Sequence, residues 1–227
     1  MVGTLLDKIN EACSIDQNPT GLLLISQPNT AGKSRIPGTT HETNAVMNIM
    51  SPTAIQSLLL EGDAATASRV KNEMNTHSWV HFACHAVQDQ KEPLKSRFYL
   101  DDGPLELLEI IRQKFPKTDH AFLSACQTST GDEKLSDEAV HLAAGMLAAG
   151  YRGVVATMWS IDDKHAPQIA LNFYSQLLDS SSGEQGKKLE VSRAAYALDN
   201  SIKKIRDSVG NTEDGLLTWV PYVHFGI

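Results

Sequence analysis

Cysteine is scarce in this sequence, since Cys13, Cys84 and Cys126 are the only three among 227 residues. A small secreted protein stabilised by disulfides carries more cysteines, in even number, so that class is excluded. The low cysteine usage favours a reducing compartment, and no charged-then-apolar leader opens the chain. We therefore expect a cytoplasmic protein without a signal peptide.

Long apolar runs and clusters of positive charge are also missing. The longest apolar runs fall well short of the roughly 20 residues that a membrane-spanning helix needs. The net charge is -7, and no stretch is rich in Lys and Arg, so we expect neither nucleic acid nor a membrane as a partner. The hydrophobic content of 41% is sufficient for one large domain with a buried core.

What the chain does contain is an alternation of short apolar runs with segments of helical spacing. Strands are expected at 21–26, 55–60, 79–84, 121–125 and 152–159, and a hairpin at 98–105. Helices are expected at 41–50, 107–115, 137–149, 164–178 and 189–209, with Ser136 as the cap of the third. A further helix is expected after Asp63 as its N-cap, with Ala64, Ala67, Val70 and Met74 on one face. Because the strands are continuously apolar, they predict an α/β fold with a mostly parallel sheet covered on both faces, in which the strands at 121–125 and 152–159 are neighbours.

Two of these strands stop at a reactive side chain. His85 follows one apolar run, and Cys126 follows another, 41 residues further along the chain. The carboxyl ends of parallel strands meet at one edge of the sheet, where ligands bind. An imidazole at that edge can take the proton of a thiol and make the cysteine a nucleophile. We therefore predict Cys126 as the nucleophile and His85 as its base or imidazolium partner.

The ordinary role of a lone cysteine is core packing, because a free cysteine behaves as a small apolar residue. Polar residues at 127–132 follow Cys126 at once, which places it at the end of a strand rather than inside one. Side chains alternate along a strand, so Cys84 points away from His85. We expect Cys84, unlike Cys126, to be buried packing.

Two other kinds of site, a zinc site and a phosphate-binding loop, are suggested by residue types in the sequence but disfavoured by the positions of those residues. Residue types that bind zinc occur at His77, His81, Cys84 and His85. On a strand, Cys84 faces away from the two nearest histidines, and no second ligand pair has zinc spacing, so no metal site is expected. The Gly-Lys-Ser at 32–34 resembles the end of a phosphate-binding loop, but position 27 is Gln rather than Gly. We expect a solvated loop there.

Three stretches together carry a more specific resemblance. They are His-Phe-Ala-Cys-His at 81–85, Leu-Ser-Ala-Cys-Gln-Thr at 123–128, and Val-Val-Ala-Thr-Met-Trp-Ser-Ile-Asp-Asp at 154–163. In this order they resemble the CHAT domain, a caspase-like and separase-like cysteine peptidase family often attached to tetratricopeptide repeats. The end of the chain at 219–226 resembles the family's last strand. The Ala-Cys-Gln core is also similar to the caspase signature, whose His lies about 50 residues upstream.

The resemblance implies a caspase-like three-layer α-β-α sandwich over 21–227, with an N-terminal extension at 1–20, as part of a longer protein. It implies a cysteine endopeptidase that cleaves protein substrates through the Cys126–His85 dyad, without a cofactor, a metal or a third acid. Family members can be regulatory, cell-death or defence proteases, and some act on gasdermin-like substrates. A tetratricopeptide-repeat region of the same protein would be a partner. The alternative is a non-catalytic interaction module in a signalling protein.

The resemblance also assigns roles around the dyad. The oxyanion would be held by the backbone N–H of Cys126 and of the residue after His85, which is normally Gly and here is Ala86, whose side chain is expected to perturb the turn. By similarity to separases, which prefer Arg before the cut, Asp163 is the candidate acid of the specificity pocket, with Asp162 beside it. This predicts cleavage after Arg or Lys. If both aspartates only cap the helix that follows, an apolar preference is expected instead.

Overall fold

The computed structural model of the chain describes residues 21–89, 91–124, 139–159, 161, 165–180 and 188–227. Several residues singled out above lie outside these ranges: Cys13, Cys126, Ser136, Asp137, Asp162 and Asp163. Their predicted roles therefore stay predictions.

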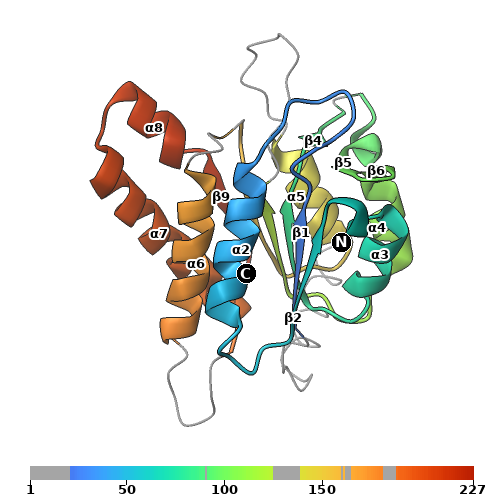
Figure 1. Cartoon of the computed structure of the whole chain (residues 1–227), viewed down its shortest axis with the longest axis horizontal. Helices are drawn as coiled ribbons and strands as arrows, with labels where there is room; N and C mark the ends of the chain where they lie inside the picture. The colour runs from blue at the N-terminus through green and yellow to red at the C-terminus, as the bar shows by residue number, and fades with distance from the viewer. Residues whose placement is uncertain (1–20, 90, 125–138, 160, 162–164, 181–187) are drawn as a thin grey trace, which may run out of the picture.

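A six-stranded sheet forms the middle layer of the molecule, in the order β2-β1-β3-β7-β8-β9 (Figure 1). Its strands are β1 (Leu22–Ser26), β2 (Ser57–Glu61), β3 (Trp79–Ala83), β7 (His120–Ser124), β8 (Gly153–Thr157) and β9 (Tyr222–Gly226). The first five strands in this order, from β2 to β8, run parallel, and β9 lies antiparallel to β8 at one edge. The predicted mostly parallel sheet is confirmed, as is the pairing of β7 with β8.

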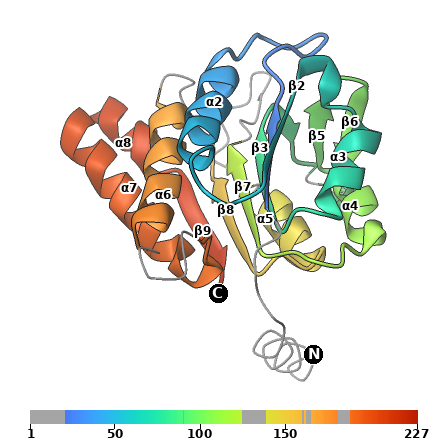
Figure 2. The same cartoon turned by 60° about the horizontal axis from the view of Figure 1, so that its bottom comes forward.

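Helices cover both faces of this sheet (Figures 1 and 2). One face carries α2 (Gly38–Met50), α6 (Ala166–Ser180) and α7 (Ala194–Val209), and the other carries α3 (Ala67–Met74), α4 (Leu107–Gln113) and α5 (Ala139–Ala148). Every residue of β1 and β3 is buried, and alternate side chains enter two separate cores. Leu23 and Ile25 pack with residues of α3, α4 and α5, whereas Leu22 and Leu24 pack with residues of α2, α6 and α7. This confirms the three-layer sandwich.

A smaller antiparallel sheet follows the end of β3. It consists of β4 (Ala86–Val87), β5 (Arg97–Leu100) and β6 (Gly103–Glu106). The turn between β5 and β6 lies within the predicted hairpin, and Gly103 there adopts φ +135°, a conformation that side chains rarely tolerate. Phe82 of β3 stacks on Phe98 of β5 with ring centroids 4.2 Å apart. This contact fastens the small sheet to the end of β3, where His85 lies.

The start of α3 differs from its prediction. Asp63 does not cap this helix, because Gly62–Ala64 forms a separate 3-10 turn. The N-cap is Thr66, whose hydroxyl accepts a hydrogen bond from the Arg69 N–H at 3.3 Å. Asp63 has the residue type of a cap, but Gly62 adopts φ +57° and bends the chain before a helix can begin.

Other elements differ in extent. α2 begins at Gly38, three residues earlier than expected, directly after Pro37, whose fixed φ suits a helix start. The helix expected over 189–209 is divided into a 3-10 turn at Val191–Arg193 and α7. A further 3-10 turn at Pro93–Lys95 and the two-residue β4 were not predicted, because segments this short leave no clear hydrophobic period. α8 (Glu213–Trp219) was not predicted either, because the residues that it buries, Gly215 and Thr218, are not large apolar ones.

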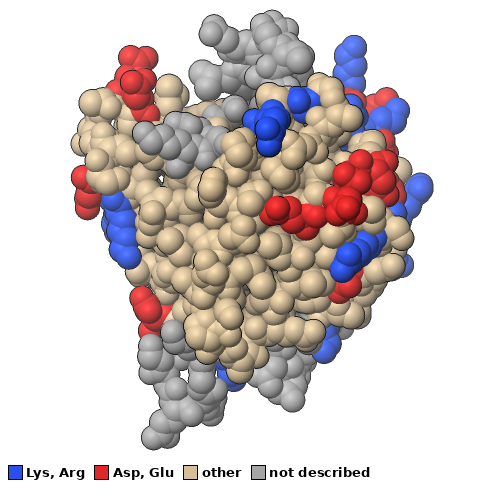
Figure 3. Space-filling view, viewed as in Figure 1, with Lys and Arg blue, Asp and Glu red and all other residues tan. Residues whose placement is uncertain are grey.

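The surface shows no concentration of positive charge on the face that Figure 3 displays. Acidic side chains gather there on the side of α3 and α4, whereas Lys and Arg are scattered and the broad centre carries few charges. Within the described part of the chain, none of the helices is both long and apolar enough to cross a membrane.

Candidate active site at the carboxyl edge of the sheet

The strands that precede the predicted dyad are direct neighbours. β3 and β7 pair in parallel, and Ala83, the last residue of β3, is opposite Ser124, the last residue of β7. In sequence, His85 follows Ala83 by two positions, and Cys126 follows Ser124 by two. The prediction that the two strands run side by side and end together is confirmed. Cys126 itself lies outside the described residues.

His85 is buried and is held by a main-chain group. The residue is only 1% exposed, and its Nε2 lies 2.7 Å from the carbonyl oxygen of Ser34. A carbonyl oxygen only accepts hydrogen bonds, so Nε2 carries the proton. Nδ1 of His85 has no hydrogen-bond partner among the described residues. The ring is thus fixed in the tautomer whose Nδ1 can accept a proton.

The Ser34 carbonyl reaches His85 because the chain between β1 and α2 folds back over the end of β3. Gln27 donates a backbone hydrogen bond to Ala83 at 2.9 Å, and Ile36 donates one to Pro28 at 3.0 Å. The ammonium group of Lys33 lies 4.7 Å from the centre of the Tyr99 ring. The Gly-Lys-Ser at 32–34 therefore belongs to a loop that supports His85, and the following helix begins only at Gly38.

Ala86 lies in an ordinary strand conformation. The Tyr99 N–H donates to the His85 carbonyl at 2.8 Å, so Ala86 and Phe98 form the pair of the antiparallel ladder that exchanges no hydrogen bonds. The N–H of Ala86 consequently points away from β5. Lys114 alone, among the described non-glycine residues, has a positive φ. The side chain of Ala86 therefore imposes no backbone strain, contrary to the expectation from the sequence, and it packs in the core with Phe98.

A buried polar cluster lies beneath this edge, and the sequence analysis did not identify it. The Glu42 carboxylate on α2 accepts a hydrogen bond from the Ser124 hydroxyl at 2.9 Å and lies 3.0 Å from Nε2 of His81. Nδ1 of His81 lies 3.3 Å from the hydroxyl of Tyr174 on α6. Burial, and then the charge of Glu42, raise the pKa of Tyr174 well above its usual range. Helical spacing could have revealed Glu42, because it precedes the buried Val46 by one turn.

The other candidate metal ligands in and beside β3, including the thiol of Cys84, lie apart from one another. Cys84 is fully buried in the core on the side of α3, α4 and α5, as expected. His81 faces the opposite core, where it contacts Glu42 and stacks on Phe122. Nδ1 of His77 lies 2.9 Å from the carbonyl of Glu73. Across the described ranges, no group of three or more His, Cys, Asp or Glu side chains could hold a metal ion.

The start of α5 is held by the segment after β4. The side-chain carbonyl of Gln88 accepts hydrogen bonds from the N–H groups of His141 and Leu142, at 3.1 and 3.3 Å. Free N–H groups at a helix start need such acceptors. This contact links the small sheet beside His85 to α5.

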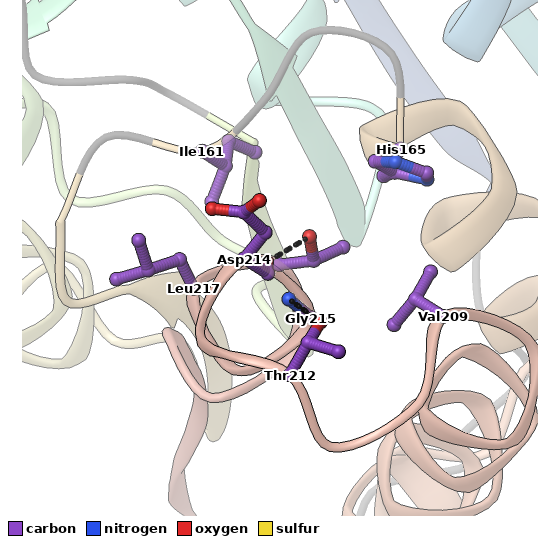
Figure 4. Close-up of a pocket in the computed structure, with 8 residues that line it drawn as sticks. Ile161, His165, Val209, Thr212, Asp214, Gly215 and Leu217 are labelled. Carbon is purple, nitrogen blue, oxygen red and sulfur yellow. Dashed lines mark hydrogen bonds between the residues drawn. The ribbon is translucent and has the colours of Figure 1, made fainter.

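A pocket is lined by Ile161 and His165, the described residues that flank the predicted specificity residues in sequence. It has a volume of about 530 Å³, and its residues are Ile161, His165, Val209, Thr212, Asp214, Gly215, Leu217 and Thr218. Figure 4 shows the Asp214 carboxylate directed toward Ile161, at the base of α8. The hydroxyls of Thr212 and Thr218 are engaged within α8, with Gly215 N–H and the Asp214 carbonyl. The pocket thus combines the apolar side chains of Ile161, Val209 and Leu217 with polar groups, among them one carboxylate.

A mostly parallel six-stranded sheet between two helical layers makes this an α/β three-layer protein, and its fold is gingipain-like and caspase-like. Solved structures of similar fold include the complex of the pro- and mature domains of RgpB from Porphyromonas gingivalis, with a TM-score of 0.58 and 12% identity over 92% of this chain and 47% of that one. The Arg-specific cysteine proteinase gingipain R gives a TM-score of 0.56 and 13% identity, over 92% of this chain and 46% of that one. This chain therefore spans less than half the length of either structure.

A comparison of the sequence with family models shows which family the chain belongs to. Residues 3–226 match the family model of the CHAT domain, so the chain belongs to the CHAT domain family. Among curated proteins, none matches the sequence. The prediction from the three motifs is thereby confirmed.

Proposed function

We propose that the protein is a cysteine endopeptidase in which Cys126 attacks a peptide carbonyl and His85 carries the proton. The arrangement of His85 is the observation that supports this best. The imidazole is buried beside the end of β7, its Nε2 is held by the Ser34 carbonyl, and its Nδ1 is left to accept a proton. Other buried histidines of the described residues, His120 among them, also have unpaired ring nitrogens, so the support comes from the position of the free Nδ1 at the carboxyl end of β3, next to the strand that precedes Cys126.

In the proposed reaction, the Cys126 thiol transfers its proton to Nδ1 of His85, and the thiolate attacks the carbonyl carbon of the substrate. The resulting oxyanion is stabilised by the backbone N–H groups of Ala86 and Cys126. The C–N bond then breaks, and the departing amine takes the proton from Nδ1. Water, deprotonated by His85, hydrolyses the thioester and regenerates the thiol.

The first prediction concerns dependence on the dyad. Cys126→Ala and His85→Ala should each abolish cleavage of a diverse peptide library, because each removes a reacting group. Cys84→Ala should retain activity and lose a modest amount of stability, because it removes a sulfur atom from a packed core. Cleavage rates and melting temperatures of the three variants test this, and full activity in Cys126→Ala would refute the assignment.

We further propose that the substrate residue before the cut is Arg or Lys, with Asp163 as its carboxylate partner and Asp162 beside it. Ile161 and His165, which flank these aspartates in sequence, line the pocket whose wall includes Asp214. Apolar walls suit the methylene stem of a long basic side chain, and a carboxylate suits its charged end. A gingipain with a similar fold is described as Arg-specific, which agrees with the proposal.

The second prediction tests this specificity with one set of peptides that carry Arg, Lys, Leu, Met or Asp before the cut. Asp163→Ala should lose the Arg and Lys peptides selectively, and Asp214→Asn reports whether the neighbouring pocket contributes. If the aspartates at 162 and 163 only cap a helix, their replacement should lower stability by about 0.5–2 kcal/mol and leave the ranking of peptides unchanged.

A non-catalytic interaction module remains the alternative function. The sequence feature that favoured it was Ala86, and the strand geometry of that residue removes this support. A peptide-based electrophilic probe separates the two functions: in an active peptidase, the probe labels Cys126 ahead of the other two thiols.

The finer proposal is a cytoplasmic regulatory or defence protease of gasdermin-like proteins, with a repeat region of the same protein as its regulator. Incubation of such proteins with the wild type and Cys126→Ala tests it.

A further inference from the structure

A continuous polar chain crosses the core directly below the edge where His85 lies, and the proposed reaction uses none of its members. It runs from Ser124 of β7 to Glu42 of α2, then to His81 of β3 and Tyr174 of α6. All four residues are buried, and the Glu42 side chain is only 2% exposed. The chain therefore joins four elements of the fold, with Ser124 opposite Ala83 and His81 opposite Phe122 in the pairing of β3 with β7.

A buried carboxylate at position 42 needs a physical reason. Removing an ionised group from water is costly, and a well-packed apolar residue often stabilises a core as much as a buried ion pair does. Val46 and Met50 continue the same face of α2 as apolar residues, so an apolar side chain at 42 would extend an existing pattern. What a carboxylate adds is a directed contact with β7, because one oxygen accepts the hydrogen bond of Ser124, while the other lies 3.0 Å from Nε2 of His81 without a hydrogen bond.

The two halves of the proposed dyad depend on different segments. His85 is oriented by the Ser34 carbonyl, which lies four residues before the start of α2. Ser124 is the last residue of β7, and Cys126 comes two positions after it in the sequence. Glu42 lies in α2 and accepts the hydrogen bond of Ser124, so it provides a direct contact between α2 and the end of β7.

We infer that Glu42 is a positioning residue that sets the end of β7, and with it Cys126, relative to His85. The inference rests on the proposed peptidase function and deepens it. The rate of the chemical step depends strongly on the placement of the reacting groups, since a displacement of about 1 Å can reduce it roughly 100-fold. Loss of the Glu42–Ser124 hydrogen bond therefore reduces the reactivity of the thiol, even though neither residue touches the substrate.

The test measures the rate of Cys126 alkylation by iodoacetamide as a function of pH, with each cysteine quantified by mass spectrometry in the intact chain. Glu42→Gln and Ser124→Ala should lower this rate at pH 7 by about tenfold or more, and should move the pH profile toward that of His85→Ala. Ser124→Ala leaves the Glu42–His81 pair in place, so the test does not depend on how well Glu42→Gln folds. Ser201→Ala is the matched control, because it removes another fully buried hydroxyl, bonded to Ala197 on α7.

The outcomes separate the inference from the proposed function. If His85→Ala slows alkylation and both network variants keep the wild-type profile, the positioning role is refuted and the dyad stands. If His85→Ala also keeps the wild-type profile, the dyad is refuted, and the positioning role with it. For peptide cleavage, the inference expects a lower kcat with KM within about twofold, since positioning affects the chemical step more than binding. A lower melting temperature with unchanged kcat would mean that the network is structural only.

Discussion

At the scale of single residues, the described half of the candidate site is built from main-chain groups. The Ser34 carbonyl orients His85, and the N–H of Ala86 points away from β5. Sequence reasoning found His85 because it follows an apolar strand. It could not find Ser34, because a backbone carbonyl leaves no signal in residue type, and its position depends on how the loop at 27–37 folds back.

The residue after His85 gives the third prediction. Ala86→Gly should not raise turnover, because Ala86 already has an ordinary strand conformation and its N–H is available in that geometry. The variant should instead lose roughly 0.5–1 kcal/mol of stability, since glycine is unfavourable within a strand. Steady-state kinetics and denaturant unfolding measure the two effects. A several-fold rise in turnover would show that the methyl group does distort the oxyanion site.

At the scale of elements, prediction succeeded where the hydrophobic period was long or continuous. The five parallel strands were expected within a few residues of their observed bounds, because each contains a run of apolar residues; four of them are buried at every position, and β2, at the edge, is partly buried. β4 was missed because two residues carry too little periodicity, and α8 because the residues that it buries, Gly215 and Thr218, are not large apolar ones. The polar chain through Glu42 was missed because a carboxylate is normally exposed, and its partners come from β3, β7 and α6.

The fourth prediction concerns the start of α3. Thr66→Ala should destabilise the protein by about 0.5–2 kcal/mol, because the Thr66 hydroxyl accepts the hydrogen bond of a free N–H group in the first turn. Asp63→Ala is the matched control, and it should change stability by less than about 0.5 kcal/mol, because Asp63 is exposed and precedes the helix within a separate turn. Chemical denaturation of both variants decides the point, and a larger loss in Asp63→Ala would contradict the observed cap.

At the scale of the whole molecule, a buried histidine links the stability of the fold to pH. His120 is fully buried in the first position of β7, where its ring stacks on Trp79 with centroids 4.5 Å apart and lies 5.6 Å from that of Phe173. Burial lowers the pKa of His120 well below its usual range, and the nearby His224 and His81 lower it further. Burial also lowers the pKa of His224.

The fifth prediction follows from these shifts. Above about pH 6.5 both the folded and the unfolded chain hold these histidines neutral, so stability does not depend on them. Below that pH the unfolded chain binds protons that the folded chain excludes, so the free energy of unfolding should fall by up to about 1.4 kcal/mol per pH unit for each such histidine. His120→Phe keeps the aromatic stack and should flatten this dependence, as measured by denaturant unfolding from pH 8 to 5. An equal slope in the variant would exclude His120 as the cause.

The hydrogen bond from His85 to the Ser34 carbonyl has a consequence for genetics. The Ser34 side chain is exposed, and every amino acid supplies the same carbonyl, so a survey of random substitutions should find position 34 tolerant. Proline at position 35 would restrict the backbone of residue 34 itself and is expected to be harmful. Substitutions at position 34 would therefore not reveal the carbonyl that orients His85, whereas proline at position 35 would.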